Sequence, residues 1–232
     1  MPTLLLLRHG RSTANTRGVL AGRTPGVPLD ERGTEQAAAL PVRLGGIPLS
    51  AIVSSPLERC QETLRPLRAA LPGTPVHTDE RISECDYGEW SGRKLAELAE
   101  EPLMRTVQVH PSAAAFPGGE SMRAMQARAV EAVRDWNERI EAEHGADAVY
   151  LMCSHGDIIK SVLADALGLH LDLFQRISVE PCSVSAVRYT PIRPFVVRVG
   201  DTGELAGLAP ADEGPKEGGE SDAAVGGGAG TS

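Results

Sequence analysis

The chain has 232 residues, enough to bury a substantial core, and its length fits one domain of ordinary α/β size better than two. Hydrophobic residues make up 41% and charged residues 23%, as in a typical globular protein, whereas aromatic residues reach only 3%. Few aromatic side chains leave little material for stacking bases, which disfavours a protein that binds single-stranded nucleic acid.

The formal net charge of −8 is concentrated at the C-terminal end. Residues 201–232 contain seven acids against Lys216 alone, a net charge of −6, which leaves −2 for residues 1–200. No basic face of the kind that binds a nucleic-acid backbone is visible. We therefore expect no nucleic-acid partner, whereas a small anionic ligand would need only a local positive pocket.

Cysteine usage and the first residues bear on the cellular compartment. The four cysteines, Cys60, Cys85, Cys153 and Cys182, are widely spaced and form no CxxC pair, so no disulfide framework is indicated. The first apolar run holds only four leucines, which is too short for a signal peptide or a membrane span. We expect a cytoplasmic protein with reduced thiols and no membrane partner. The oligomeric state stays open, with a homodimer as one option.

Short apolar runs alternate with helical patterns in the first part of the chain. Leu4–Leu7 ends in the letters RHG, which favours a strand buried on both faces. Asp30 has the character of an N-cap for a helix that continues through Ala39. Ala51–Val53 predicts a second strand, and the letters SSP at 54–56 indicate a helix start with a serine cap and a proline in the first turn.

The second part of the chain continues the alternation. Residues 120–143 predict a long amphipathic helix, whose apolar stripe we interpret as core packing rather than a ligand site. The stripe consists of Met122, Met125, Ala129, Val133, Trp136 and Ile140. Residues 148–153 predict a strand that runs into the letters SHGD and then a helix. Residues 184–189 and 195–199 predict two late strands, and residues 201–232, rich in glycine and acids, predict a disordered tail.

Strands that alternate with helices predict an α/β fold over residues 1–200, a three-layer αβα sandwich with a mostly parallel central sheet. In such sheets, ligands bind beyond the carboxyl ends of the strands. Three of the expected strand ends carry polar groups, namely RHG at 8–10, SSP at 54–56 followed by Arg59, and SHG at 154–156. Their coincidence predicts a site at that edge of the sheet.

The residue types at these strand ends suit phosphoryl transfer. A phosphate dianion that moves to a nucleophile needs cationic and N–H donors around its oxygens and an in-line attacking atom. Arg8 and Arg59 can provide planar guanidinium forks. Of His9 and His155, one can attack as a neutral imidazole while the other, if protonated, stabilises the developing charge.

The loop after the first strand adds smaller donors. Gly10 permits a close approach of the backbone, and Ser12 and Asn15 supply uncharged polar groups. The six histidines show no His-x-His or His-x3-His pairing, so we expect no dedicated metal site. We expect no other cofactor.

Six segments, which follow one another in a fixed order across residues 3–190, resemble the histidine phosphatase superfamily, the phosphoglycerate-mutase-like enzymes. They are MPTLLLLRHGRSTAN, AGRTPGVPLDERGTEQA, IVSSPLERCQET, RISECDYGEWSG, FPGGES and LMCSHGDIIK. The resemblance implies the phosphoglycerate-mutase-like fold and a metal-independent enzyme that forms a phosphohistidine intermediate.

The resemblance also implies roles for individual residues. His9 matches the phosphorylated histidine, His155 the second histidine, and Glu84 the carboxylate that protonates the leaving oxygen and later activates water. A carboxyl beside a bound phosphate can hold a proton because the dianion opposes its ionisation. With Ser12 and Gly156, the pocket residues of the matched motifs complete the expected substrate-binding set of Arg8, Ser12, Asn15, Gly22, Arg59 and Gly156.

Two other functions stay open beside hydrolysis. Phosphoglycerate mutases of this superfamily carry an ERHYG-type sequence and a later arginine pair, whereas this chain reads ECDYGEWSG, closer to the phosphatase-like GEWxG pattern, with no adjacent arginine pair. We therefore rank hydrolysis ahead of mutase activity. A non-catalytic phospho-ligand-binding relative is disfavoured because both histidines, both arginines and the glutamate are present.

Residues 93–119 are expected to cover the mouth of the pocket and to set substrate choice. An apolar wall could come from Val107, Val109, Phe116 and Pro117, and contacts to an acidic substrate from Arg93, Lys94 and Arg105. Because Cys60, Cys85 and Cys153 lie beside motif residues, a further hypothesis is that their oxidation affects the pocket.

Overall fold

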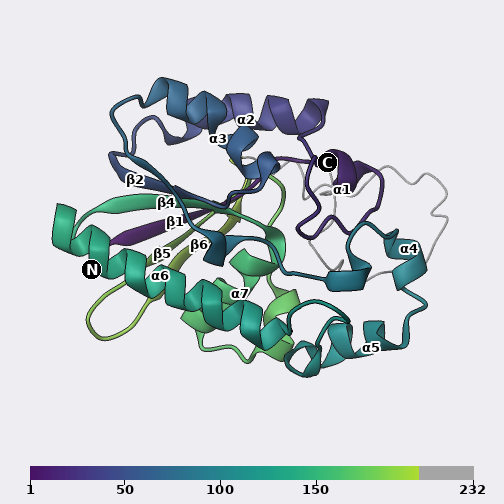
Figure 1. Cartoon of the computed structure of the whole chain (residues 1–232). Helices are drawn as coiled ribbons and strands as arrows, with labels where there is room; N and C mark the ends of the chain where they lie inside the picture. The colour runs from purple at the N-terminus through teal and green to yellow at the C-terminus, as the bar shows by residue number, and fades with distance from the viewer. Residues whose placement is uncertain (204–232) are drawn as a thin grey trace.

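The computed structural model describes residues 1–203, which fold around one six-stranded sheet (Figure 1). The strand order across the sheet is β3-β2-β4-β1-β5-β6. The first four strands in this order are parallel, whereas β5 runs antiparallel to β1 and β6 antiparallel to β5. The strands are β1 Thr3–Arg8, β2 Leu49–Ser54, β3 Val76–Thr78, β4 Val149–Ser154, β5 Val184–Arg188 and β6 Phe195–Asp201.

Helices cover both faces of this sheet, which confirms the predicted three-layer sandwich. Figure 1 shows α2 and α3 on one face and α6 and α7 on the other. The longer helices are α2 Glu31–Leu44, α3 Glu58–Ala70, α5 Pro102–Val109, α6 Met122–His144 and α7 Gly156–Leu167. The short helices are α1 Thr13–Thr16 and α4 Leu95–Leu98, and 3-10 turns lie at Glu80–Ile82, Gly88–Trp90, Pro111–Ala113 and Leu171–Arg176.

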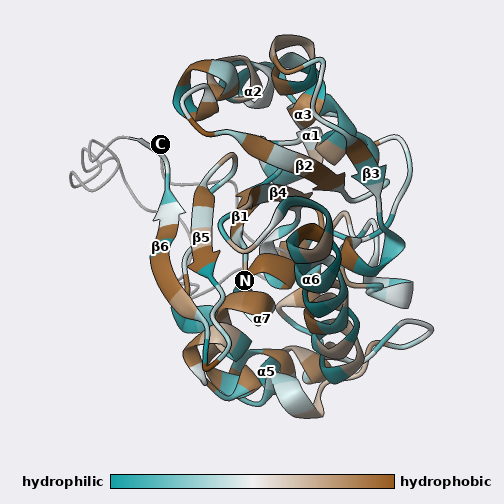
Figure 2. Cartoon of the chain, turned by 90° about the vertical axis from the view of Figure 1, so that its left-hand side faces the viewer, coloured by the Kyte–Doolittle hydropathy of each residue, from teal (hydrophilic) through white to brown (hydrophobic). Residues whose placement is uncertain are grey.

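The leucine run of β1 is buried on both faces, as its sequence predicts. Leu4 and Leu6 pack in the core on the α6 and α7 side, whereas Leu5 and Leu7 pack in the core on the α2 and α3 side. Side chains that alternate across a strand are the reason for this division. Figure 2 shows hydrophobic residues along β2 and β5, between the two helical layers. Because β1 lies between the two helical layers, its last residue, Arg8, and the next, His9, are buried.

The long amphipathic helix is confirmed as α6, and all six residues of its predicted stripe are buried. Ser121 caps its first turn by accepting a hydrogen bond from the backbone of Ala124. The two late strands also form as predicted and pair as an antiparallel hairpin.

The start of α3 differs from the prediction. The helix begins at Glu58, its N-cap position is Leu57, and no side chain caps it. The two preceding serines are used otherwise, because the Ser54 hydroxyl donates to the carbonyl oxygen of Ser55, and the Ser55 hydroxyl lies 2.8 Å from a ring nitrogen of His155. Pro56 therefore lies just before the helix rather than in its first turn.

Two residues expected at the pocket mouth belong to the core instead. Val107 is fully buried, and Phe116 packs edge-on against Tyr87 and Trp90. The segment 93–119 therefore adds to the hydrophobic core, whereas Val109 and Pro117 of the expected apolar wall are exposed.

The C-terminal boundary of the folded part lies close to the expected residue 200, since β6 ends at Asp201. The predicted disordered tail lies, from residue 204 onward, outside the described residues. Within the described part, none of the helices combines the length and apolar character that crossing a membrane requires.

Gly33 allows α2 to pack against the loop that follows β1. A Cβ atom at Gly33 would lie 1.9 Å from the carbonyl oxygen of Arg11, and a Cβ at Gly10 would lie 2.7 Å from the carbonyl oxygen of Gly33. Gly33→Ala should therefore lower the free energy of unfolding by about 1–3 kcal/mol, because overpacking outweighs the better helix propensity of alanine.

Urea unfolding of Gly33→Ala and of the control Gly46→Ala measures this effect. A Cβ at Gly46 meets nothing within 4 Å, so the control should stay within about 1 kcal/mol of the wild type. Equal stability of the two variants would show that the close approach of α2 to the loop is not required.

Candidate active site

Two histidines lie side by side where β1 and β4 end. The parallel register pairs Arg8 with Ser154, and the backbone N–H of His9 donates to the carbonyl oxygen of Ser154 at 3.0 Å. His9 and His155 each follow the last residue of their strand, and their ring centroids are 5.2 Å apart. Exposed fractions of 3% and 0% show that both rings are nearly shut off from solvent.

The heavy-atom contacts define which nitrogen of His9 is available. Nδ1 lies 2.7 Å from the carbonyl oxygen of Gly10, and because a carbonyl oxygen only accepts, Nδ1 carries the hydrogen. Nε2 then has the lone pair, toward which Arg59 Nε points at 3.3 Å. Burial lowers the pKa of His9 well below its ordinary value, and the charges of Arg59 and Arg8 lower it further. These contacts and the lowered pKa favour a neutral His9, whose Nε2 lone pair accepts a hydrogen bond from Arg59 Nε.

Two buried arginines at the site come from different elements. Arg59 comes from the first turn of α3, and its Nη2 donates to the carbonyl oxygen of Gly22 at 2.8 Å. Arg8 is the last residue of β1, is 1% exposed, and donates to the carbonyl oxygen of Val179 at 2.8 Å. Two buried guanidinium groups beside a nucleophile make a local positive pocket of the kind that a phosphate dianion needs.

Glu84 is a buried carboxyl at the same site. It is 3% exposed, and its Oε1 accepts a hydrogen bond from the backbone of Cys85 at 2.9 Å. Burial first, and then the negative charge of Asp157, raise the pKa of Glu84 to about 7, against the opposing charges of Arg59 and Arg8. A carboxyl with this pKa can hold a proton at neutral pH and release it.

The peptide unit of Glu84 is clamped by two arginines. Arg23 Nε and Arg128 Nη2 donate to the carbonyl oxygen of Glu84 at 2.9 and 3.1 Å. Both guanidinium groups also bind the carboxylate of Glu120. The backbone at Glu84 is therefore fixed relative to the loop that carries Gly22 and relative to α6.

His155 stands at the N-cap position of α7, directly before Gly156. Its Nε2 lies 2.8 Å from Ser55 Oγ and 3.5 Å from Cys60 Sγ. Its Nδ1 is buried and has no hydrogen-bond partner among the described residues. Burial, followed by the charge of Arg59, lowers the pKa of His155 well below its ordinary value. The ring is thus hydrogen-bonded through Nε2, whereas its buried Nδ1 can still bind a ligand.

The loop after β1 is ordered by its own hydrogen bonds. The backbone N–H and the hydroxyl of Ser12 both donate to Asn15 Oδ1, at 3.0 and 2.8 Å. Gly22 has φ +51°, and a Cβ there would lie 2.6 Å from Ser91 Oγ, so the position favours glycine. Gly22 contributes its carbonyl oxygen to Arg59, whereas the hydrogen bonds of Ser12 and Asn15 run between each other, so their contact with a substrate stays a prediction.

The structure adds residues to the site that sequence reasoning missed. Asp157 is fully buried and accepts a 2.7 Å hydrogen bond from the hydroxyl of Tyr87, with Lys160 Nζ at 3.9 Å. Thr63 Oγ1 accepts from the backbone N–H of Gly10 at 2.9 Å. Asp157 is next to the SHG letters, which was the one available signal, but nothing in the sequence places Tyr87 beside it.

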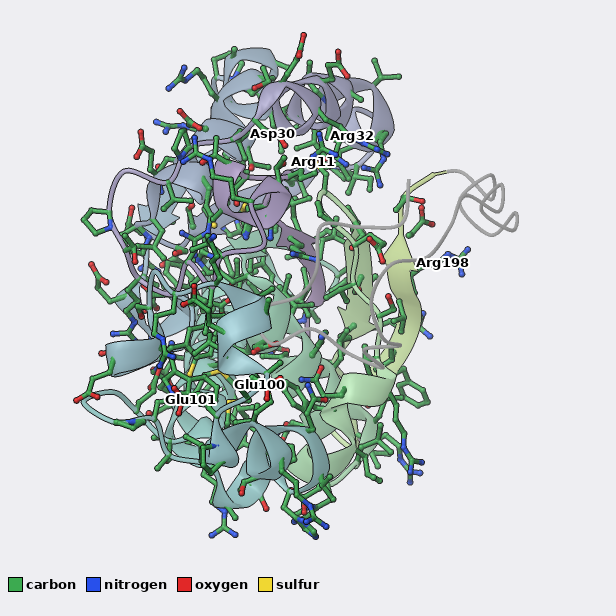
Figure 3. All side chains as sticks on the ribbon, turned by 90° about the vertical axis from the view of Figure 1, so that its right-hand side faces the viewer. Arg11, Asp30, Arg32, Glu100, Glu101 and Arg198 are labelled. Carbon is green, nitrogen blue, oxygen red and sulfur yellow. The ribbon has the colours of Figure 1, made fainter. Side chains whose placement is uncertain are left out.

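Of the cationic side chains expected at the pocket mouth, namely Arg93, Lys94 and Arg105, Arg93 is paired, with its Nη1 2.7 Å from a carboxylate oxygen of Glu101. Outside that segment, Arg11 Nε lies 2.6 Å from Asp30. Figure 3 shows Arg11 and Asp30 near the start of α2 and Glu101 on the chain beside α4. In the described part of the chain, no group of three or more His, Cys, Asp or Glu residues is placed to hold a metal ion.

All four cysteines are free and buried. Burial raises the pKa of the Cys85 and Cys153 thiols, which disfavours the reactive thiolate. The hypothesis that oxidation controls the pocket therefore loses support for these two residues, whereas Cys60 stays in contact with His155.

Curated proteins of similar sequence include a phosphatase and a mutase. Phosphoserine phosphatase 1 of Hydrogenobacter thermophilus is 30% identical over 208 residues, which cover 88% of this chain and 95% of that protein. The 2,3-bisphosphoglycerate-dependent phosphoglycerate mutase 2 of Gloeobacter violaceus is 31% identical over 191 residues, 78% of this chain and 83% of that protein. The chain spans about half, 54%, of a bifunctional protein of Mycobacterium tuberculosis to which it is 34% identical.

Solved structures show the same fold. The mycobacterial glucosyl-3-phosphoglycerate phosphatase in complex with VO3 superposes with a TM-score of 0.76 at 26% identity, covering 86% of this chain and 98% of that chain. Bacillus stearothermophilus YhfR gives a TM-score of 0.76 at 27% identity, with 87% and 98% covered. The family profile described as histidine phosphatase superfamily (branch 1) matches residues 4–202, so the chain belongs to this superfamily, as its sequence segments predicted.

Proposed function

We propose that the chain is a phosphomonoester hydrolase that acts on a small phosphorylated metabolite through a phosphohistidine at His9. The observation that carries this proposal is the pair of contacts made by His9, whose Nδ1 lies 2.7 Å from the carbonyl oxygen of Gly10 while Nε2 faces the guanidinium of Arg59. A buried imidazole whose Nε2 lone pair lies beside a guanidinium can attack phosphorus once a phosphoryl group takes over the hydrogen bond from Arg59.

In the first step, His9 Nε2 attacks phosphorus and the bond from phosphorus to the ester oxygen breaks. Arg8 and Arg59 hold the phosphoryl oxygens, and the backbone N–H of Gly156, at the first position of α7, can donate to them because it has no partner within the helix. The leaving oxygen takes a proton from Glu84, whose raised pKa supports this role.

In the second step, water attacks the phosphohistidine. The Glu84 carboxylate accepts a proton from the water as its oxygen bonds to phosphorus, and the bond from phosphorus to Nε2 breaks. Inorganic phosphate leaves, while His9 is again neutral and Glu84 again protonated. Each residue returns to its starting state, so no other co-reactant is needed.

Hydrolysis is favoured over mutase activity by the charges near the pocket. A mutase must hold an intermediate that carries further anionic groups, which calls for free cations around the phosphate pocket. Arg11 and Arg93 each pair with a carboxylate of the chain, and Arg23 shares the carboxylate of Glu120 with Arg128. A substrate with one phosphate and an otherwise uncharged body fits this arrangement better.

His9→Ala should lower phosphatase turnover by roughly 10³-fold or more, because the covalent intermediate cannot form. The assay uses p-nitrophenyl phosphate with EDTA present, together with rapid acid-free trapping of ³²P-labelled enzyme and mapping of the label. His144→Ala, which removes a histidine from the last turn of α6, is the matched control and should keep activity. Label on any residue other than His9 would contradict the proposal, and an inactive wild type would favour a phospho-ligand-binding protein.

Glu84→Gln should change both stability and leaving-group dependence. The folded chain keeps Glu84 protonated up to about pH 7, whereas the ordinary pKa is 4.5, so the wild type loses stability as the pH rises through this range. The variant lacks this loss and should gain on the order of 2–3 kcal/mol relative to wild type between pH 5 and 8 in urea unfolding. Parallel pH curves for the two proteins would refute the raised pKa.

The same variant tests proton donation. Turnover of an alkyl phosphate should fall by about 10²–10⁴-fold, because an alkoxide needs a proton to leave. Turnover of p-nitrophenyl phosphate should fall much less, since its leaving group departs as an anion. Equal losses for both substrates would assign Glu84 a structural role.

A panel of small phosphate monoesters separates hydrolysis from isomerisation. We expect free phosphate from several substrates and no need for a bisphosphorylated primer. With 3-phosphoglycerate, efficient conversion to its isomer that requires such a primer and releases little phosphate would establish the mutase alternative instead.

A further inference from the structure

The hydroxyl of Ser55 can donate its hydrogen to only one acceptor among the described residues. Ser55 is fully buried, and its Oγ lies 2.8 Å from His155 Nε2 and 3.3 Å from the backbone nitrogen of Leu57. The backbone N–H of Leu57 can only donate, so it uses Oγ as an acceptor. Among the described residues, His155 Nε2 is then the one acceptor within reach, and buried hydroxyl groups are almost always hydrogen-bonded. Ser55 therefore donates to Nε2.

A nitrogen that accepts a hydrogen bond carries no hydrogen, so in neutral His155 the hydrogen is on Nδ1. Nδ1 is buried without a hydrogen-bond partner in the described part of the chain, on a ring 5.2 Å from that of His9. The thiol of Cys60, 3.5 Å from Nε2, can send its own hydrogen to the carbonyl oxygen of Ser154 at 3.7 Å. Cys60 therefore does not require a hydrogen on Nε2.

We propose that Ser55 is a positioning residue that fixes His155 in the Nδ1–H tautomer, so that a neutral imidazole donates a hydrogen bond to the phosphoryl group. The inference rests on the proposed function, because it assumes that the phosphoryl group lies between the two rings. It replaces the expected imidazolium at His155 with an uncharged donor.

The two histidines then have the same tautomer and opposite roles. His9 binds the chain through Nδ1–H and presents the lone pair of Nε2, whereas His155 binds the chain through Nε2 and presents Nδ1–H. In the other tautomer, His155 would direct a lone pair at the phosphate oxygens, which also carry lone pairs. By selecting the tautomer, Ser55 thus decides whether His155 donates a hydrogen bond to the phosphate oxygens or repels them with a lone pair.

Protonation of His155 would conflict with the same contacts. Nε2–H would have to donate to Ser55 Oγ, and the buried hydroxyl hydrogen would lose its acceptor. The neighbouring charges of Arg8 and Arg59 also keep the pKa of His155 low. The geometry therefore favours a neutral His155 as the donor. A neutral imidazole donates through Nδ1 only in one tautomer, which the contact with Ser55 selects.

The test measures the tautomer in the full-length free enzyme by ¹⁵N NMR of the imidazole nitrogens, with His155 assigned through the His155→Gln variant. In the wild type, Nδ1 should give a signal of the protonated type and Nε2 one of the unprotonated type. In Ser55→Ala, the population should shift toward Nε2–H, which can point at Cys60 Sγ. Turnover should fall about 10- to 100-fold, by analogy with the loss found when a partner that orients a metal-bound histidine is removed.

Two further variants distinguish this effect from a loss of packing. Ser55→Thr keeps a hydroxyl and should restore the Nδ1–H tautomer and most of the turnover. Ser161→Ala removes another fully buried serine hydroxyl, one that donates only to the carbonyl oxygen of Ile158 within α7, and should leave tautomer and turnover unchanged. Thermal unfolding checks that each variant is folded.

Three results would overturn the inference, namely Nε2–H at His155 in the wild type, an unchanged tautomer in Ser55→Ala, or a loss of turnover in Ser55→Ala without a change of tautomer. The wild-type spectrum decides the first of these even if Ser55→Ala does not fold. Failure of the proposed function is recognised separately, because it appears as missing label on His9 while the tautomer of His155 stands as measured.

Discussion

The parallel pairing of β1, β4 and β2 is the constraint on which the site depends. Its backbone ladder continues one residue past the strand ends, where His9 N–H donates to the carbonyl oxygen of Ser154 and Ser55 N–H donates to that of Cys153, both at 3.0 Å. These two bonds put His9, His155 and Ser55 side by side although the residues are far apart in the chain. A shift of register by one residue would turn the side chains to the other face of the sheet.

The same buried environment favours unprotonated histidines and a protonated glutamate. Burial disfavours charge on any of them, so it lowers the pKa of His9 and His155 and raises that of Glu84. The arginine charges help to keep the histidines neutral but oppose protonation of Glu84. The negative charge of Asp157 offsets the arginines at Glu84, which gives this buried aspartate an electrostatic purpose.

The sequence predicts the layers of the fold well because burial periodicity is a local property. The apolar pattern of the run at Leu4–Leu7 and of the stripe of α6 predicts which of these residues are buried. The letters at the strand ends place His9 and His155 at one edge of the sheet. The start of α3 was predicted wrongly because the SSP letters describe a local cap, whereas Ser55 is bound by a residue 100 positions away. The core position of Phe116 likewise depends on Tyr87 and Trp90, which no local pattern connects to it.

Glu84 lies outside the sheet, and its backbone is positioned by side chains instead of by strand pairing. It lies in the loop after the 3-10 turn Glu80–Ile82, where no strand ladder fixes the backbone. Arg128 and Arg23 supply the missing hydrogen bonds to its carbonyl oxygen, and the two arginines share the single carboxylate of Glu120. Because the clamp takes the backbone oxygen, the side chain stays free to exchange its proton. The sheet thus positions the nucleophile and its partner histidine, while side chains from α6 and two loops position the proton donor.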